Sequence, residues 1–467
     1  MRSLRPLVLL AALHLPVLPA LAETRLPEGQ AEISLSFAPV VKQAAPAVVN
    51  IYVRQLVETR SSPFAGDPFF QEFFGAMGQD FGPARQRVEN SLGSGVIVSP
   101  DGIVISNYHV TGTATDIRVV LSDRREYDAK VLLSDQQSDL AVLKIESETP
   151  LPFLELGDSE ALEVGDLVLA IGNPFGIGQT VSSGIVSGLA RSALQVGDGS
   201  GYFVQTDAPI NPGNSGGALV DMAGRLIGIN SAIVTTSGGS NGIGFAIPAN
   251  LVQAVIAQAR EGSSHFARPW AGISGQLVDG GLADALGMDL PRGVLISGLH
   301  PQSPFAAAGL REGDVVLSLA GQPVNTPQEF LFRLSLLPAG KAVAFEWLQD
   351  GAVKSGEITP AAAPDSPERL SQVLGPREGL EGLGLARINP SLIAEYRLAL
   401  NAAGVVVTAT EGISGSSGLR PGDIITGING QAVELPRDVG LLLVAAGRRV
   451  QIDLIRDGQP LRLRFRL

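Results

Sequence analysis

The chain has 467 residues, of which 45% are hydrophobic and 5% aromatic, with 56 glycines, no cysteine and a formal net charge of −12. This length predicts two to four domains, and the composition is typical of a globular protein rich in turns and strands. The acidic balance argues against nucleic acid or an anionic membrane as the main partner, and the lack of cysteine excludes a thiol nucleophile.

Residues 1–22 have the pattern of a secretory signal peptide. Arg2 and Arg5 precede an apolar run, and the segment ends in Ala-Leu-Ala, which is typical of a signal cleavage site. We therefore expect cleavage after Ala22 and export of the mature chain. The alternative is a membrane anchor, but prolines interrupt the segment, and it is shorter than the roughly 20 apolar residues that a span needs.

Beyond residue 35, short apolar runs alternate with Gly and Asn turns, which predicts many short strands arranged in barrels or a sandwich. These runs are residues 47–57, 95–98, 117–121, 167–171 and 226–229.

The segment 58–90 is long and punctuated by Gly and Pro, beyond the length of an ordinary structureless loop. We expect either a local hydrophobic cluster or a regulatory loop that docks on another subunit or covers the active site. It carries six of the 17 phenylalanines: Phe64, Phe69, Phe70, Phe73, Phe74 and Phe81.

A catalytic base emerges by elimination among the four histidines. His14 lies in the signal segment, His265 in a polar stretch and His300 in a turn-like stretch. His109 follows an apolar strand and is the one good candidate. Asp139 immediately precedes another apolar strand, where a buried acid is unusual, so it is the candidate that orients the imidazole. Asp135 is the alternative carboxylate.

Residues 211–219 read Asn-Pro-Gly-Asn-Ser-Gly-Gly-Ala-Leu and place Ser215 on a glycine-rich turn before a strand. A serine hydroxyl needs a base and oxyanion donors to act as a nucleophile, and small neighbours let backbone N–H groups approach a carbonyl. A plain turn between strands is the alternative. The order His109, Asp139, Ser215 along the chain matches chymotrypsin and not subtilisin or the α/β-hydrolases.

The C-terminal part contains an internal repeat after a predicted helix at 249–260 and a polar linker at 261–269. Residues 309–316 recur 109 residues later as 418–425, both with the pattern Gly-Leu-Arg-x-Gly-Asp. This pattern resembles the PDZ fold, so two such domains are expected, joined by a linker at 359–379. Successive N–H groups of a loop can hold a peptide carboxylate while the following strand pairs with the peptide. The candidate loops are Trp270, Ala271, Gly272 and Ile273 in the first copy, and Gly382, Leu383, Gly384 and Leu385 in the second.

Taken together, the segments around His109, Asp139 and Ser215, followed by two PDZ-like copies, resemble the HtrA family of serine proteases, and most closely its bacterial periplasmic Do members of the DegP and DegQ type. The resemblance covers essentially the whole mature chain. Tyr108 stands where Asn is common in the family, and Pro209 stands where Ala is common. Neither departure removes a catalytic group, but Pro209 lies near the expected specificity pocket.

The resemblance implies a mainly β protein, with a chymotrypsin-like double β-barrel followed by two PDZ domains. The expected domains are a signal peptide at 1–22, a protease domain at 23–260 with a regulatory loop at 58–90, and PDZ domains at 268–360 and 376–467. It further implies a periplasmic endopeptidase acting on unfolded or misfolded polypeptides, with peptide C-termini bound at the PDZ domains, in a homotrimer that can form larger cages.

Within that expectation, the backbone N–H groups of Gly213 and Ser215 form the oxyanion hole. The strand after the serine lines the specificity pocket, and a small apolar P1 side chain is expected unless Asp207 points into it. The expected pocket residues are Ile229, Asn230, Ser231, Ala232 and Ile233.

No cofactor and no metal site is expected, because the three histidines of the mature chain are far apart in sequence and zinc sites need clustered ligands. Chaperone activity as a second function stays open. Two other functions fit part of the same pattern: a non-proteolytic periplasmic chaperone or binding protein, and a signalling protease that cuts one specific target.

Overall fold

The computed structural model describes residues 36–57, 87–112, 114, 116–173, 178–191, 195–196, 199–200, 202–211, 213–233, 242–447 and 449–466. The expected signal peptide and all six phenylalanines of the segment 58–90 lie outside these residues.

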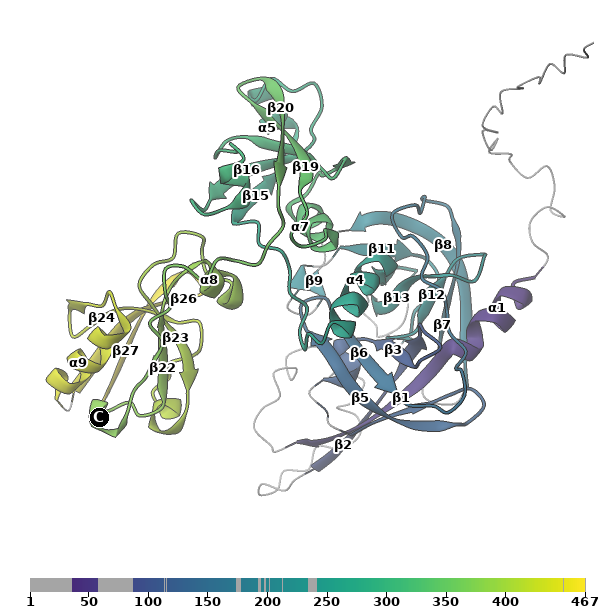
Figure 1. Ribbon diagram of the computed structural model, residues 1–467, viewed down its shortest axis with the longest axis horizontal. Helices are drawn as coiled ribbons and strands as arrows, with labels where there is room; N and C mark the ends of the chain where they lie inside the picture. Colours follow the sequence, from purple (N-terminus) through teal and green to yellow (C-terminus); the bar gives the residue numbers. More distant parts are fainter. Residues whose placement is uncertain are drawn as a thin grey trace, which may run out of the picture. The chain divides into compact units, whose positions relative to one another are not determined.

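The first barrel is closed by six antiparallel strands in the order β1-β2-β3-β6-β5-β4 (Figure 1). Strand β4 shows why the sequence folds this way, because exposed Asp116 and Arg118 alternate with buried Ile117 and Val119, the period expected of a half-buried strand. The strands are β1 (Val48–Val57), β2 (Arg87–Ile97), β3 (Ile103–Ser106), β4 (Asp116–Val120), β5 (Glu126–Asp135) and β6 (Leu140–Ile145). Helix α1 (Ala38–Ala44) and the 3-10 helix η1 (Ala45–Ala47) come before β1, and the short helix α3 (Tyr108–Thr111) follows β3.

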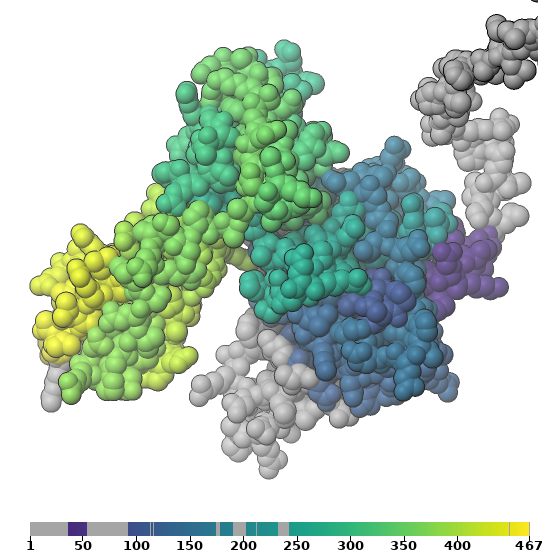
Figure 2. Space-filling view, viewed as in Figure 1, coloured from purple at the N-terminus to yellow at the C-terminus, as the bar shows by residue number. Residues whose placement is uncertain are grey.

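The second barrel is also closed by six strands, in the order β11-β14-β13-β12-β7-β8. They are β7 (Leu167–Gly172), β8 (Thr180–Arg191), β11 (Phe203–Thr206), β12 (Ala218–Val220), β13 (Leu226–Ile233) and β14 (Gly244–Pro248). A separate pair, β9 (Gln195–Val196) and β10 (Gly199–Ser200), lies between β8 and β11 in the chain. The blue and teal residues of the two barrels form one continuous body in the space-filling view (Figure 2).

Helix α4 (Ala249–Arg260) follows the second barrel at the residues where the sequence predicts a helix. Leu251, Val252, Val255 and Ile256 are buried along one face, as the spacing of an amphipathic helix requires. The helix packs against β13 and β14 of the second barrel and against β5 and β6 of the first. It therefore covers both barrels at one side.

The first PDZ-like repeat is a sheet in the order β15-β16-β17-β19-β20, in which β18 also pairs with β17. Its core contains the aromatic rings of Phe305, Phe330, Phe345 and Trp347, which meet in tilted, edge-on and stacked pairs. Its elements are β15 (Ile273–Leu277), α5 (Gly280–Ala285), β16 (Val294–Leu299), α6 (Pro304–Ala307), β17 (Val315–Leu319), β18 (Gln322–Pro323), α7 (Pro327–Leu336), β19 (Val343–Gln349) and β20 (Ala352–Ile358).

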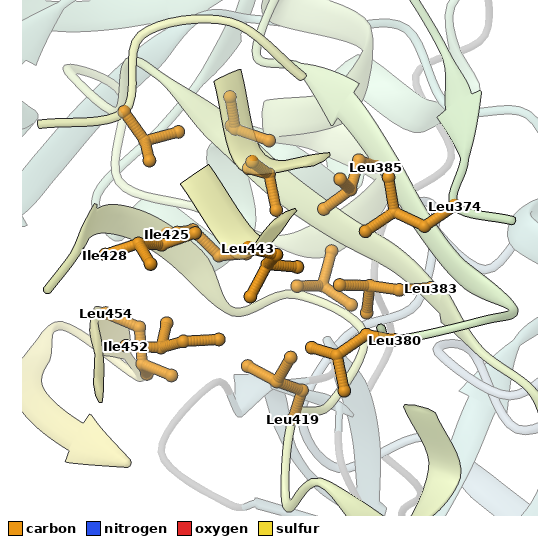
Figure 3. Packing of buried hydrophobic residues seen from close by; sticks show 14 of the residues in the cluster. Leu374, Leu380, Leu383, Leu385, Leu419, Ile425, Ile428, Leu443, Ile452 and Leu454 are labelled. Atoms are coloured by element: carbon orange, nitrogen blue, oxygen red, sulfur yellow. The ribbon is translucent and has the colours of Figure 1, made fainter. Parts of the chain in front are cut away.

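The second repeat has the same strand order with one strand added, β21-β22-β23-β24-β26-β27, and β25 pairs with β24. Its aliphatic core is shown in Figure 3. Its elements are β21 (Gln372–Val373), η4 (Pro376–Glu378), β22 (Leu383–Arg387), α8 (Pro390–Tyr396), β23 (Val405–Thr410), η5 (Gly412–Ser416), β24 (Ile424–Ile428), β25 (Gln431–Ala432), α9 (Pro436–Ala446), β26 (Arg449–Arg456) and β27 (Gln459–Arg466).

The repeated Gly-Leu-Arg-x-Gly-Asp pattern encodes the same turn twice. The Asp314 carboxylate accepts a hydrogen bond from the backbone N–H of Arg311 at 2.8 Å, and Asp423 accepts one from Arg420 at 2.8 Å. The glycine before each aspartate has a φ near +90°, which glycine adopts at least cost. The predicted fold class, a mainly β chain with a double barrel followed by two PDZ-like domains, is therefore confirmed.

Candidate active site

His109 lies in α3, directly after strand β3, and its ring faces Asp139. The His109 Nδ1 atom lies 2.9 Å from Asp139 Oδ1 and 2.8 Å from Oδ2. The His109 backbone N–H also donates to Asp139 Oδ1, at 3.0 Å. Both side chains are mostly shielded from water, with 21% of the His109 and 15% of the Asp139 side chain exposed. The carboxylate thus holds both the backbone and the ring of His109, which fixes the orientation of the imidazole.

Asp139 is presented by the turn between β5 and β6, where its backbone has a φ of 54°. Aspartate is one of the few residues other than glycine that visits this left-handed region. The conformation is held from the α3 side, because the Asp139 carbonyl oxygen accepts from the Tyr108 backbone N–H at 3.1 Å and from the Asn107 side-chain amide at 2.9 Å. Helix α3, which carries His109, and the turn that carries Asp139 are therefore joined by several hydrogen bonds.

Ser231, on β13 of the second barrel, connects Asp139 to Ser215. Its hydroxyl donates to Asp139 Oδ2 at 2.8 Å, and its backbone carbonyl oxygen accepts from the Ser215 hydroxyl at 3.1 Å. One residue of the second barrel therefore contacts both the Asp139 carboxylate of the first barrel and the candidate nucleophile. The structure brings His109, Asp139 and Ser215 into one site through these contacts.

The turn that carries Ser215 requires its glycines. Gly216 has a φ of 82°, and a Cβ there would lie 2.0 Å from the Ser94 carbonyl oxygen and 2.6 Å from the Ser106 hydroxyl. The turn is hydrogen-bonded to the first barrel, because the Ser94 N–H donates to the Ser215 carbonyl oxygen at 2.9 Å. The Ser94 hydroxyl donates to the Gly213 carbonyl oxygen at 2.6 Å. Residues of both barrels thus set the position of the serine.

These contacts use the carbonyl groups of the turn and leave two of its N–H groups available. Within the described part of the chain, the Gly213 and Ser215 backbone N–H groups have no hydrogen-bond partner, whereas the neighbouring Gly216 N–H donates to Asn230 and the Gly217 N–H to Asn214. An unpaired backbone N–H beside a nucleophile can bind a developing oxyanion.

Asp135, the alternative carboxylate, serves a different contact. It forms an ion pair with Arg268 through both carboxylate oxygens, one of them 3.1 Å from Nη1. It also accepts from the Ser138 N–H at 2.9 Å and from the Ser138 hydroxyl. Burial by itself would raise the pKa of Asp135. The hydrogen bonds and positive charge of Arg268, together with the two hydrogen bonds from Ser138, nevertheless hold this pKa below its usual range. Asp135 therefore shapes the turn that presents Asp139.

The expected pocket residues lie on β13, where Ile229, Asn230 and Ser231 are buried. The Asn230 side-chain amide donates to the Ala218 carbonyl oxygen at 3.0 Å, and its backbone pairs with Gly216 and Gly217. Asn230 therefore holds the serine turn against β13. Ala232 and Ile233 continue the same strand.

Asp207 is exposed, and its carboxylate accepts from the Ile185 backbone N–H at 2.6 Å. This contact ties the chain after β11 to β8, which is a structural use of the acid.

The first candidate peptide loop precedes β15. Gly272 has a φ of 61° and packs against the Trp270 ring, which meets the His300 ring edge-on. The Gly272 carbonyl oxygen accepts from the His300 N–H at 2.8 Å. The second candidate loop begins at Gly382, whose φ is 83°, and leads into β22. Each loop thus leads into the strand beside which a bound peptide would pair.

Among the described residues, no group of three His, Asp or Glu side chains is arranged to hold a metal ion. The helices in that part of the chain are all too short or too polar to cross a membrane.

Four contacts of this site were not predicted from the sequence. These are the Ser231 hydroxyl on Asp139, the Asn107 amide on the Asp139 carbonyl, and the two Ser94 contacts with the serine turn. Ser231 is 92 residues away from Asp139, and Ser94 is 119 residues away from Gly213. No local sequence pattern could have shown these pairs.

Two known protein families match parts of this chain. The trypsin-like peptidase domain family matches residues 93–229, and the PDZ domain family matches residues 271–359. A probable periplasmic serine endoprotease DegP-like of Pseudomonas fluorescens is 38% identical over 448 residues, which cover 92% of this chain and 93% of the relative. The protein of the same description from Halomonas elongata is 39% identical over 446 residues, with the same coverage of both chains.

Solved structures of HtrA-type proteases also align with this chain. The HtrA-type protease AlgW with a decapeptide aligns with a TM-score of 0.52 and 40% identity, covering 71% of this chain and 99% of that one. The same protease with a tripeptide aligns with a TM-score of 0.53 and 38% identity, covering 71% and 99%. The chain therefore belongs to the HtrA family of serine endopeptidases, among its DegP-like members.

Proposed function

We propose that His109, Asp139 and Ser215 form the catalytic triad of this endopeptidase. Ser215 Oγ attacks the peptide carbonyl and gives its proton to His109 Nε2, the ring nitrogen opposite the one that faces Asp139. Asp139 keeps the imidazole in the required tautomer and stabilises the imidazolium that forms. His109 then protonates the leaving amine, and a water molecule releases the acyl group by the same steps in reverse order.

The Gly213 and Ser215 N–H groups are proposed to stabilise the oxyanion of the tetrahedral intermediate. Their lack of partners in the described part of the chain supports this role. A donor of this kind contributes on the order of 10²–10³ in rate. The pocket is proposed to be formed by the strand from Ile229 to Ile233, with a small apolar side chain at P1, because Asp207 is engaged with Ile185.

The proposed substrates are unfolded or misfolded polypeptides, because the cleft of such a protease takes an extended chain. The PDZ domains, at 268–360 and 376–467, would tether substrate C-termini and raise the effective concentration of substrate near Ser215.

The relatives are named periplasmic, and we propose the same location here, with residues 1–22 removed as a signal peptide. Assembly as a homotrimer, larger cages and an additional chaperone activity are part of the same proposal.

The observation that carries the proposal is the connection of Ser215 to Asp139 through Ser231, with Asp139 also holding His109 Nδ1. A binding protein with an inert barrel has no need of this arrangement.

The proposed substrate class is tested by incubating the protein with one substrate in two states, native and chemically unfolded, and mapping the cut sites by mass spectrometry. We expect cleavage of the unfolded state at several sites, after small apolar residues. Cleavage at a single sequence in either state would favour a signalling protease. Suppression of aggregation without any cleavage would favour a chaperone.

A further inference from the structure

The peptide-facing strand of the second PDZ-like repeat is already paired with a segment of the same chain. Strand β21 runs antiparallel to β22, with Gln372 opposite Leu385 and Val373 opposite Gly384. In the first repeat the corresponding strand, β15, stands at the end of the sheet, and none of the described strands pairs with its outer edge. The two repeats therefore differ at the edge where a PDZ domain adds a peptide strand.

Leu374, the residue after β21, makes the contacts expected of the last residue of a bound peptide. Its N–H donates to the Leu383 carbonyl oxygen at 2.9 Å, and its carbonyl oxygen accepts from the Gly382 N–H at 2.9 Å. Gly382 opens the loop that the sequence assigned to carboxylate binding. The backbone of Leu374 thus occupies the place where the terminal carboxylate of a peptide would meet the loop.

The Leu374 side chain also packs in the apolar core of the repeat. Only 1% of it is exposed, and it belongs to the same core cluster as Leu383 and Leu385 of β22 and Val439 and Leu443 of α9. Figure 3 shows Leu374 beside Leu385 and Leu383. In a PDZ domain, the side chain of the terminal peptide residue enters between the sheet and this helix. Leu374 therefore takes the place of an apolar C-terminal side chain.

Glu378 holds the segment in place from the adjoining turn. Its carboxylate accepts from the Gly375 backbone N–H at 2.7 Å and from the Gln372 side-chain amide at 3.3 Å. Gly440 of α9 lies against the same carboxylate, since a Cβ at that position would be 2.3 Å from Glu378 Oε1. The helix thus has a glycine where the turn after Leu374 packs.

The burial of strands β15 and β22 differs accordingly. Leu383, Gly384, Leu385 and Ala386 of β22 are all buried, whereas every residue of β15 is exposed or partly exposed. The outer edge of β22 is covered by β21, whereas none of the described strands covers the outer edge of β15.

We propose that residues 372–374 are an internal ligand of the second PDZ domain, which closes its groove to external peptides. The first PDZ domain is then the receiver of substrate C-termini, and the second accepts an extended peptide with an apolar C-terminal residue only when residues 372–374 are displaced. This inference rests on the proposed function of the repeats as binders of extended peptides.

The test uses the full chain carrying Ser215→Ala, so that the probe is not cut, and a fluorescent peptide ending in Gln-Val-Leu with a free carboxylate. Calorimetry measures the number of peptides bound per chain, and hydrogen exchange reports which strand is protected. Leu374→Asp places a charge in the apolar core and should release the segment. Val373→Asp is the matched control, because 70% of Val373 is exposed and the segment should stay seated.

We expect one peptide per chain in the Ser215→Ala background and in the Val373→Asp control, with added peptide protecting β15 amides. In Leu374→Asp we expect two peptides per chain, with the β22 amides exchanging faster in its absence and protected again in its presence. Glu378→Ala, which removes two hydrogen bonds but leaves the apolar core intact, should give a partial second site if Leu374→Asp fails to fold.

Two peptides per chain in the Ser215→Ala background would contradict the proposal of an internal ligand but not the proposed tethering of substrates. One peptide, at β15, in both release variants would also overturn it, while leaving substrate tethering intact. Failure of any variant to bind peptide at either repeat would instead contradict the proposed tethering function together with the internal ligand.

Discussion

The Ser231 hydroxyl, on the second barrel, donates a 2.8 Å hydrogen bond to the Asp139 carboxylate, on the first. Asp139 thereby receives hydrogen bonds from His109 and Ser231 and lies at the junction of the two barrels. Ser231 touches no reacting atom through this hydroxyl, so it is a positioning residue.

Ser231→Ala should lower kcat by about 10- to 100-fold, because a hydrogen bond to a charged group contributes about 1.5–3 kcal/mol and each 1.4 kcal/mol is a factor of ten. KM should change little, since the hydroxyl is turned toward Asp139. Kinetics with a short peptide substrate provide the measurement, and Ser231→Thr should recover most of the loss. An unchanged kcat in the alanine variant would show that His109 and the turn hold Asp139 without Ser231.

Asp139→Asn and Asp135→Asn form a matched pair that separates the catalytic carboxylate from its neighbour. Asp139→Asn should lower kcat by on the order of 10⁴, because an amide in this place favours the wrong imidazole tautomer. Asp135→Asn should lower thermal stability more than activity, because its contacts are with Arg268 and Ser138. Equal or reversed losses in kcat would transfer the catalytic role to Asp135.

The ion pair of Asp135 and Arg268 predicts a pH-dependent contribution to stability. Since the folded-state pKa of Asp135 is lowered, its contribution is fully present above the unfolded-state pKa of about 3.9 and is lost as the pH falls through the lower folded value. Thermal unfolding between about pH 2 and 6 should show this loss in the wild type.

In Arg268→Met the buried carboxylate has no cation, which should cost about 3–5 kcal/mol at neutral pH. The difference in melting temperature between the two proteins should shrink at acid pH, where Asp135 is protonated in both. A constant difference over the whole range would contradict the ion pair as its source.

Gly216→Ala should distort the turn that carries Ser215 and lower activity more than Gly165→Ala does. A left-handed backbone costs an alanine about 1–2 kcal/mol, and here the Cβ would also collide with the Ser94 carbonyl oxygen. Gly165→Ala is the control, because its φ is 108° but nothing lies within 4 Å of an added Cβ. Activity should fall sharply in the first variant and little in the second, as measured by kcat/KM at a temperature where both remain folded.

Much of this site could be predicted from the sequence because its groups lie in local patterns. His109 follows a strand and stands out among four histidines, Asp139 precedes a strand, and Ser215 lies in a glycine-rich turn whose φ angles require glycine. The strand runs predicted barrels or a sandwich, and the 109-residue repeat predicted two further domains. The double barrel itself was implied by the resemblance to the HtrA family.

The contacts of Ser231, Ser94 and Leu374 could not be predicted in this way. Ser231 and Ser94 act across the two barrels, and their partners depend on how the barrels pack. Leu374 lies in a segment that reads as a linker, since a two-residue strand has no periodicity to detect. It packs in the core of the second repeat, before the expected domain start at residue 376.

The central claim is that Ser215 is the nucleophile of an endopeptidase, and digestion of an unfolded protein by the wild type and by Ser215→Ala tests it most directly. The substitution should leave thermal stability unchanged within about 1 kcal/mol, because it removes one hydrogen bond to Ser231. We predict that cleavage by the wild type produces fragments within the assay time. In the variant the rate should fall by on the order of 10⁶, so that no fragment is detected. Fragments at the same positions from a folded Ser215→Ala protein would contradict the account.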